Sequence, residues 1–167
     1  MFVGVPVATG TLAGASAACA PDAGYVVTPE GHWYAAMDSP VGEYNSSTQT
    51  SSLHYDFTTD HTRTSAWEES ASVSAGWAIA KIEASTKYTV TSSVSSGKSV
   101  GTTFPVPAKD YGYVQPKVEY RSFDISYGHY SGSCAWVTTS DYGTFDAITA
   151  WPFFATCVGK SACTPKP

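Results

Sequence analysis

The sequence predicts an all-β fold, a single antiparallel β-sandwich or elongated sheet domain with an extended N-terminal arm. Leucine occurs only at Leu12 and Leu53, whereas valine, threonine, serine and tyrosine are plentiful. Such β-branched and aromatic side chains suit a pleated, half-buried surface better than a helix. Aromatic residues make up 14% of the chain, which is typical of a folded domain rather than a disordered segment. The length of 167 residues is enough for one such domain.

The first predicted strand lies around Leu53, Tyr55 and Phe57, which alternate with polar residues. Residues 104–107 end a later strand, because Pro105 and Pro107 cannot donate to a ladder. Further strands are expected at residues 111–120, 122–130, 134–139 and 144–157, punctuated by glycine and proline. We therefore expect one β domain over residues 51–167.

Between these strands, apolar side chains alternate with small polar ones in two runs of opposite phase. A slip of one residue turns every side chain to the other face, so a bulge or turn must lie near Ala80 and Lys81. A short helix over residues 78–84 is the alternative, since these residues have good helix propensity. The amphipathic positions are Ala71, Val73, Ala75, Trp77 and Ile79 in the first run, and Ile82, Ala84, Tyr88, Val90 and Val94 in the second.

The N-terminal residues predict export. Residues 1–12 are small and apolar, and residues 13–17 offer small-residue cleavage sites, a pattern typical of the end of a signal peptide. The basic start of a signal peptide is missing, so we expect residues 1–19 to be a signal-peptide remnant and the protein to be secreted. A buried apolar strand is the alternative.

Residues 20–50 contain three prolines and a polar stretch at 45–50, which predicts an extended arm and linker. Its aromatic side chains are candidates for binding a partner, or the segment could lie on the domain as an edge strand. The candidate partner-binding residues are Tyr25, Trp33, Tyr34 and Tyr44.

The four cysteines, Cys19, Cys134, Cys157 and Cys163, are expected to form disulfides in an exported domain. A bridge between Cys134 and Cys157 is the first expectation, because each borders a strand-like run. The alternative closes a short loop between Cys157 and Cys163 and leaves Cys19 for Cys134. No C-x-x-C pair is present, so no metal site is expected.

Charge and motifs argue against several functions. The formal net charge is −5 and no lysine or arginine precedes Arg63, so the basic footprint of a nucleic-acid-binding protein is missing. His54 and Asp56 lie near Asp60 and His61, but in or beside a polar turn and without a catalytic motif. We expect no catalytic residues, no cofactor and no enzymatic activity.

Residues 67–100, followed by residues 104–113, resemble small secreted actinobacterial β-proteins and, more remotely, the pore module of aerolysin-type and epsilon-toxin-like toxins. That resemblance implies an amphipathic Ser/Thr-rich hairpin that enters a membrane. The overall layout also resembles the adaptor subunits of Streptomyces umbrella toxin particles. In those proteins an N-terminal arm docks on a lectin-like partner, and residues 25–44 would play that part here.

From these observations we expect a secreted, non-enzymatic binding or assembly protein with a protein partner, a subunit of a bacterial toxin particle being the most specific version. One alternative is a pore-forming toxin that uses residues 71–94. Another is a glycan-binding domain that stacks sugars on surface tryptophans.

Overall fold

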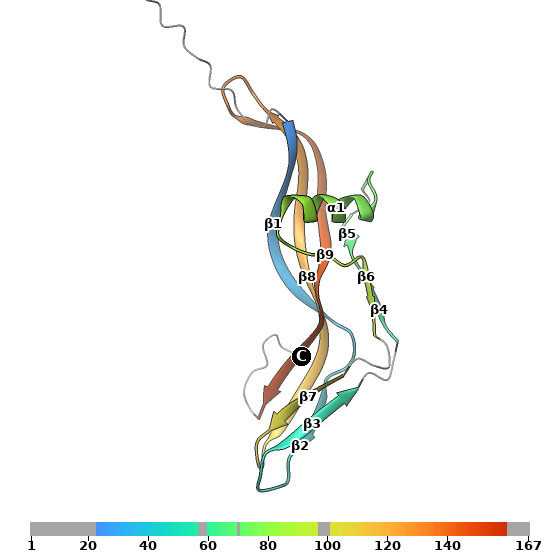
Figure 1. Ribbon diagram of the computed structural model, residues 1–167, viewed down its shortest axis with the longest axis vertical. Coiled ribbons are helices and arrows are strands. Elements are labelled where there is room, and N and C mark those ends of the chain that lie inside the picture. The colour runs from blue at the N-terminus through green and yellow to red at the C-terminus, as the bar shows by residue number, and fades with distance from the viewer. Residues whose placement is uncertain (1–22, 57–59, 70, 97–100, 160–167) are drawn as a thin grey trace, which may run out of the picture.

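In the computed structural model, which describes residues 23–56, 60–69, 71–96 and 101–159, the protein is an elongated antiparallel sheet (Figure 1). Three long strands run side by side along its length: β1 (Ala23–Ala36), β8 (Tyr111–Tyr130) and β9 (Trp136–Val158). The strand order is β1-β8-β9-β5, where β5 is Ala66–Trp67, and β2 (Val41–Tyr44) also pairs with β8. The expected all-β, antiparallel fold is confirmed.

Short elements complete the fold. Strands β2 (Val41–Tyr44) and β5 (Ala66–Trp67) extend the long sheet. Two separate two-stranded sheets pair β3 (Ser51–Asp56) with β7 (Gly101–Val106), and β4 (Thr62–Thr64) with β6 (Ser93–Ser95). The helix α1 (Ala75–Ser85) lies across the face of the three long strands (Figure 1).

Strands β8 and β9 are longer than the sequence predicts, because the glycines do not interrupt them. The sequence divides the region at residue 121, yet β8 runs on to Tyr130. Gly128 is required for packing rather than for a turn, since a Cβ there would collide with the Trp136 ring and the Val137 carbonyl group. The turn between β8 and β9 occupies residues 131–135, where Cys134 has a positive φ of 62°.

Two buried clusters lie along the sheet. One joins β8 and β9 to the β3–β7 pair; its buried members are Met37, Leu53, Tyr55, Val94, Val106, Val114, Val118, Tyr120 and Ile148. The other lies under the helix; its buried members are Ala78, Ile82, Val90, Phe123, Ile125, Phe145 and Ala147. The expected alternation at Leu53 and Tyr55 is confirmed, since both side chains are buried in β3.

Two amphipathic strands were expected over residues 71–94, and the structure corrects this. The alternative of a short helix is right, although the helix is longer than residues 78–84. Ser74 caps its N-terminus by accepting a hydrogen bond from the Trp77 N–H at 3.2 Å, and serine is a favoured residue at this position. Ala78 and Ile82, one turn apart, are fully buried against the sheet.

The expected N-terminal arm is also corrected over its described residues, 23–50. Residues 23–36 form β1 and pair with β8 along the whole strand, apart from a register shift between Pro29 and Gly31. Residues 41–44 form β2 and pair with the start of β8. The arm is therefore an edge strand of the sheet, which was the alternative that the sequence left open.

Cys134 and Cys157 are both disulfide-bonded, but they cannot be bonded to each other. Cys134 precedes the start of β9, and Cys157 lies near its end, opposite Tyr113. At about 3.3 Å per residue of strand, the two cysteines are more than about 50 Å apart, whereas disulfide-bonded Cα atoms lie within about 7 Å. The expected Cys134–Cys157 bridge is wrong, and Cys19 and Cys163 lie outside the described residues.

Candidate functional site

The most informative feature is the register shared by two separate strand pairs. In the β3–β7 pair, Ser51 lies opposite Val106 and Asp56 opposite Gly101. In the β4–β6 pair, Thr62 lies opposite Ser95. The residue numbers of all these pairs add up to the same total, 157. The two small sheets are therefore successive parts of one β-hairpin.

Backbone hydrogen bonds outside the strands keep the same register. The Ser96 N–H donates to the His61 carbonyl group at 2.9 Å, and the Ser65 N–H donates to the Ser92 carbonyl group at 2.8 Å. Over its described residues, the hairpin thus extends from Ser51 and Val106 to Ser65 and Ser92. We call this paired part the hairpin base, and the residues that connect its two strands, 66–91, the tip segment.

Side-chain hydrogen bonds, from the hairpin base and from the long sheet, join the two. Arg63 donates to the Ala36 carbonyl group at 2.8 Å, and the Tyr120 hydroxyl donates to the Thr64 carbonyl group at 3.2 Å. Burial, together with the neighbouring Asp38 carboxylate, raises the pKa of Tyr55 to about 12. Tyr55 is therefore neutral across the physiological pH range and fixed in the core.

The hairpin opens at Ser65, which is buried with 5% of its surface exposed. Its hydroxyl donates to the Thr91 carbonyl group at 2.7 Å and accepts a hydrogen bond from the Ile148 N–H at 2.8 Å. Thr91 in turn donates its N–H to the Ile148 carbonyl group at 3.0 Å. One serine side chain thus ties both hairpin strands to β9.

Beyond Ser65, the tip segment pairs with β9 instead of with itself. Ala66 lies opposite Asp146, and Trp67 lies opposite Phe145. The Glu68 N–H donates to the Thr144 carbonyl group at 3.0 Å. The β9 edge therefore provides the hydrogen bonds that the continued hairpin would otherwise make.

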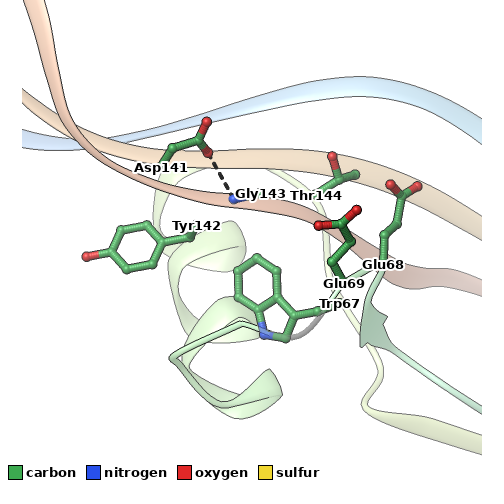
Figure 2. Close-up of a pocket in the computed structure, with 7 residues that line it drawn as sticks. All are labelled: Trp67, Glu68, Glu69, Asp141, Tyr142, Gly143 and Thr144. Atoms are coloured by element: carbon green, nitrogen blue, oxygen red, sulfur yellow. Dashed lines mark hydrogen bonds between the residues drawn. The ribbon is translucent and has the colours of Figure 1, made fainter.

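A cavity of about 470 Å³ lies where the tip segment leaves β9 (Figure 2). Its lining residues are Trp67, Glu68, Glu69, Asp141, Tyr142, Gly143 and Thr144. Asp141 accepts a hydrogen bond from the Gly143 N–H at 2.9 Å, where Gly143 has a positive φ of 82°. Three acidic residues, Glu68, Glu69 and Asp141, therefore line the cavity at this attachment.

Asp124 on β8 belongs to the same acidic region of the sheet. Burial raises the pKa of its carboxyl group, and the charges of Asp141 and then Glu30 raise it further. Asp124 lies opposite Thr144 on one side and Thr28 on the other. The described residues contain no group of three or more histidine, cysteine or acidic side chains placed to hold a metal ion.

The rest of the tip segment folds over the sheet as α1 and its flanks. Trp77 packs against Tyr25 and Tyr142, with ring centroids 5.4 and 4.9 Å apart. Lys81 lies over the Tyr25 ring at 4.0 Å, and the Val90 N–H donates to Glu83 at 3.1 Å. Of the residues expected on amphipathic strands, Ala71 and Val73 precede the helix, Trp77, Ile79 and Ile82 lie in it, and Tyr88 and Val90 follow it.

The four residues expected to bind a partner are spread along the sheet and do not form one patch. Tyr25 packs against Trp77 of the helix. The Trp33 ring stacks on the Tyr120 ring with centroids 4.4 Å apart, and the Tyr34 and Phe153 ring centroids are 4.7 Å apart. Tyr44 lies on β2, and its ring centroid is 4.9 Å from that of Tyr111. Tyr25, Trp33 and Tyr44 are partly exposed, but each serves the packing of its own part of the sheet.

The tryptophans do not form a common sugar-stacking platform. Trp67 packs on Phe145 and Trp136 on Tyr130, with ring centroids 5.1 Å apart in both pairs. Trp77 lies on the helix and Trp151 against the other buried cluster. Of the five tryptophans, Trp33 is the one with an exposed side chain, at 43%.

Sequence reasoning missed the hydrogen bonds of Ser65 that join both hairpin strands to β9, because a lone serine carries no signal of its own. The register shared by the β3–β7 and β4–β6 pairs could not be predicted either, since that requires knowing that β3 pairs with β7. No helix among the described residues is long and apolar enough to cross a membrane. Comparison of the chain with protein-family models, curated proteins and solved structures found no match.

Proposed function

We propose that this protein inserts into membranes by completing its hairpin. In this process the tip segment leaves β9, and its two halves pair with each other as a continuation of the hairpin base. The observation that carries the proposal is the single register shared by β3–β7 and β4–β6. Continued through residues 66–91, this register places Val73 opposite Ala84 and Ala75 opposite Ile82. The turn then falls around residues 78 and 79.

The completed hairpin is amphipathic. Residues directly opposite each other in an antiparallel pair lie on the same face, so odd-numbered residues of the first strand share a face with even-numbered residues of the second. One face is mostly apolar: Trp67, Glu69, Ala71, Val73, Ala75, Trp77, Ala80, Ile82, Ala84, Thr86, Tyr88 and Val90. The other is mostly polar: Ala66, Glu68, Ser70, Ser72, Ser74, Gly76, Lys81, Glu83, Ser85, Lys87, Thr89 and Thr91.

The phase change near Ala80 follows from this arrangement. The residue numbers of each opposing pair add up to an odd number, so an odd-numbered residue always lies opposite an even-numbered one. A hairpin in this register with one apolar face therefore needs apolar residues at odd positions before the turn and at even positions after it. Leu53 and Tyr55 of the base, both buried, lie on this same face. The turn divides the tip segment into strands of about ten residues or more, which suits a strand that crosses a bilayer at a tilt.

The helical form of the tip segment serves as a storage state. An isolated helix of 11 residues is marginal in water, so α1 depends on its packing against the sheet. Only Ala78 and Ile82 of this helix are fully buried. A bilayer would receive the whole apolar face of the hairpin, and each fully buried large apolar side chain contributes about 1.5–3 kcal/mol.

The experiment that tests this proposal is a cysteine pair across the expected hairpin, Val73→Cys with Ala84→Cys. In the described form, Val73 precedes the helix and Ala84 lies in its last turn, so at 1.5 Å per residue they are more than about 13 Å apart. We expect no bridge in solution and a rapid bridge on dye-loaded phosphatidylcholine vesicles, together with dye leakage from the unbridged chain.

Matched controls are Val73→Cys with Glu83→Cys and Val73→Cys with Ser85→Cys. Each moves the second cysteine by one residue, which turns it to the opposite face of the hairpin. We expect neither control to bridge on vesicles. Equal bridging of all three pairs, or an absence of both leakage and bridging, would contradict the proposal.

A second candidate function is assembly with a different exported protein through β1. The observation in its favour is the position of β1 at the end of the strand order, with 14 residues along an edge, where a partner strand can add. Deletion of residues 20–50 would remove β1 and β2 from the sheet, so it cannot test this idea.

Substitution of the exposed Val26 by lysine tests the second candidate with the sheet intact. We expect chemical cross-links from β1 to one stoichiometric secreted protein, and their loss in Val26→Lys. Cross-links that persist in the variant, or that involve no residue of β1, would overturn this candidate.

A further inference from the structure

A second cavity, of about 390 Å³, lies where the hairpin base meets the long sheet. It is lined by residues 36–40, at the end of β1 and in the β1–β2 connection, by Gln115 of β8, and by His61 and Arg63 of the hairpin base. Its volume lies within the range of small-molecule sites, about 300–1,000 Å³. The described residues that line it include none from the tip segment, so this cavity is separate from the attachment to β9.

Gln115 is the lining residue whose hydrogen bonding is incomplete. It is buried, with 5% of its surface exposed, and its Nε2 group donates to the Asp38 carbonyl group at 3.0 Å. Since a carbonyl group can only accept, the amide nitrogen must face Asp38, and Oε1 is the atom left over. Oε1 is buried and has no hydrogen-bond partner among the described residues. Such an acceptor favours a ligand that brings an N–H or O–H donor.

Arg63 brings a positive charge to the same cavity. Its guanidinium group donates to the Ala36 carbonyl group at 2.8 Å, which holds it at the cavity wall. A guanidinium group has five N–H donors, so donors remain for an anionic group of a ligand. Its planar shape matches a carboxylate or a phosphate group.

Asp38 brings a negative charge. Its carboxylate accepts a hydrogen bond from the Ser39 N–H at 2.7 Å and is hydrogen-bonded to the Tyr55 hydroxyl. A carboxylate has about four acceptor positions, so it can also accept from a ligand. Apart from His61, Arg63 and Asp38 are the titratable residues that line the cavity. One charged group of each sign suits a ligand that carries both charges better than a simple ion.

We propose that this cavity binds a small zwitterion in which a primary ammonium group lies a few bonds from a phosphate or carboxylate group. The ammonium group donates to Gln115 Oε1 and to the Asp38 carboxylate, and the anionic group accepts from Arg63. A quaternary ammonium group does not fit, because it has no N–H for Gln115. Free amino acids and ethanolamine phosphate have the required chemistry, and ethanolamine phosphate is also the headgroup of a lipid. The inference does not rest on the proposed function, since the cavity belongs to the observed form.

The test is isothermal titration calorimetry of the full chain with two probes, O-phosphoethanolamine and glycine. Their matched controls are phosphocholine and glycine betaine, in which three methyl groups replace the N–H donors. We expect at least one probe to bind about tenfold more tightly than its methylated control. The same probe should raise the melting temperature, because a ligand of the folded state stabilises it. Binding of neither probe, or equal binding of probe and control in both pairs, would overturn the inference.

Two variants connect the binding to the named side chains. Arg63→Gln should weaken binding of the probe about tenfold or more. Lys87→Gln, which removes an exposed positive charge from the tip segment, should bind like the unmodified protein. Gln115→Met, of similar size but without the amide oxygen, should bind the probe no better than its methylated control. If circular dichroism shows that Gln115→Met does not fold, Arg63→Gln still decides, and equal binding by Arg63→Gln and Lys87→Gln would refute the site.

Cosedimentation with vesicles identifies the source of the zwitterion. A preference for vesicles that contain phosphatidylethanolamine over pure phosphatidylcholine, abolished by free O-phosphoethanolamine and missing in Arg63→Gln, would assign the site to a lipid headgroup. Binding of a free probe without this preference would assign it to a soluble zwitterion.

The Val73–Ala84 cysteine pair separates this result from the proposed function. Probe binding without any Val73–Ala84 bridge on vesicles would support the zwitterion site and refute hairpin insertion. Bridging of that pair in a chain that binds neither probe would refute the site and leave hairpin insertion standing.

Discussion

The backbone N–H of Ile148 donates to the hydroxyl of Ser65 at 2.8 Å, which joins the long sheet to the point where the hairpin opens. The same hydroxyl donates to the Thr91 carbonyl group across the hairpin. A side chain without a hydroxyl at this position would leave both partners without this hydrogen bond. Ser65 is therefore the place where a single substitution should shift the balance between the observed form and the completed hairpin that we propose.

We expect Ser65→Ala to release the tip segment more readily. Loss of the hydroxyl leaves the Ile148 N–H and the Thr91 carbonyl group without this partner, and a buried group left unsatisfied costs about 1–3 kcal/mol. Amide hydrogen exchange of residues 66–91 should become faster, and vesicle leakage should begin at a lower protein concentration.

The matched control for Ser65 is Ser93→Ala, on β6 with an exposed side chain. Removal of that hydroxyl should leave both exchange and leakage unchanged. If Ser65→Ala exchanges like the unmodified protein while its overall stability falls, the serine supports the fold and does not control release.

Ser74→Ala should destabilise the helical form without disturbing the completed hairpin. The Ser74 side chain caps α1, and removal of such a cap costs about 1 kcal/mol. In the hairpin, residue 74 lies on the polar face near the turn, where alanine is tolerated. We expect faster vesicle leakage and faster exchange of residues 75–85.

Ser72→Ala provides the comparison for the helix cap. Ser72 lies on the same face of the expected hairpin but precedes the capping position. It should behave like the unmodified protein. A similar acceleration in both variants would show that any loss of a serine in this stretch has the effect, and the helix cap would carry no special role.

The sequence predicts the individual strands better than their connections. Leu53 and Tyr55 alternate cleanly because one face of β3 is buried and the other exposed. Pro29, by contrast, suggests an arm, yet β1 accommodates it with a register shift at the sheet edge. A proline without an N–H is tolerated at an edge, and nothing in the local sequence distinguishes an edge strand from a linker.

The tip segment shows why the candidate site could be predicted only in part. Its alternating pattern predicts strands, and the phase change near Ala80 predicts a break, but the pattern describes the hairpin we propose rather than the helix observed. Ser74 and the alanines of α1 favour the helix locally. This disagreement between pattern and observed structure supports the two packings that we propose, since such disagreements are expected at functional sites.

The stability of the folded protein should depend on pH through the Asp124 carboxyl group. Its pKa is raised in the folded protein, mainly by burial and then by Asp141 and Glu30. The protonated carboxyl group therefore favours folding below the unfolded-state pKa, and this contribution is lost as the pH rises through the folded-state pKa. Asp124→Asn removes the charge that the folded state disfavours.

We expect Asp124→Asn to melt at a higher temperature than the unmodified protein at pH 7 and to lose this advantage at pH 3. Thermal unfolding at both pH values measures the difference. Asp60→Asn, which removes one exposed negative charge before β4, controls for the change in net charge. A gain that is the same for both variants would assign the effect to overall charge and not to the surroundings of Asp124.

The disulfide pairing should be Cys19 with Cys134 and Cys157 with Cys163. Strand β1 begins at Ala23, opposite His129, at the end of the sheet that also holds the turn containing Cys134. Cys157 lies at the far end, and the six residues from there to Cys163 span at most about 22 Å. Cys163 therefore cannot reach Cys134, which is more than about 50 Å away along the strands.

Mass spectrometry of peptides from a non-reduced digest measures this pairing directly. We expect one linked pair to join residues N-terminal to β1 with the β8–β9 turn, and a separate pair within the C-terminal residues. Cys134→Ser should then leave Cys19 as the single free thiol and the Cys157–Cys163 pair intact. A linked peptide that joins Cys134 to Cys157 would contradict the extended course of β9, because the two cysteines meet only if that strand is folded back on itself.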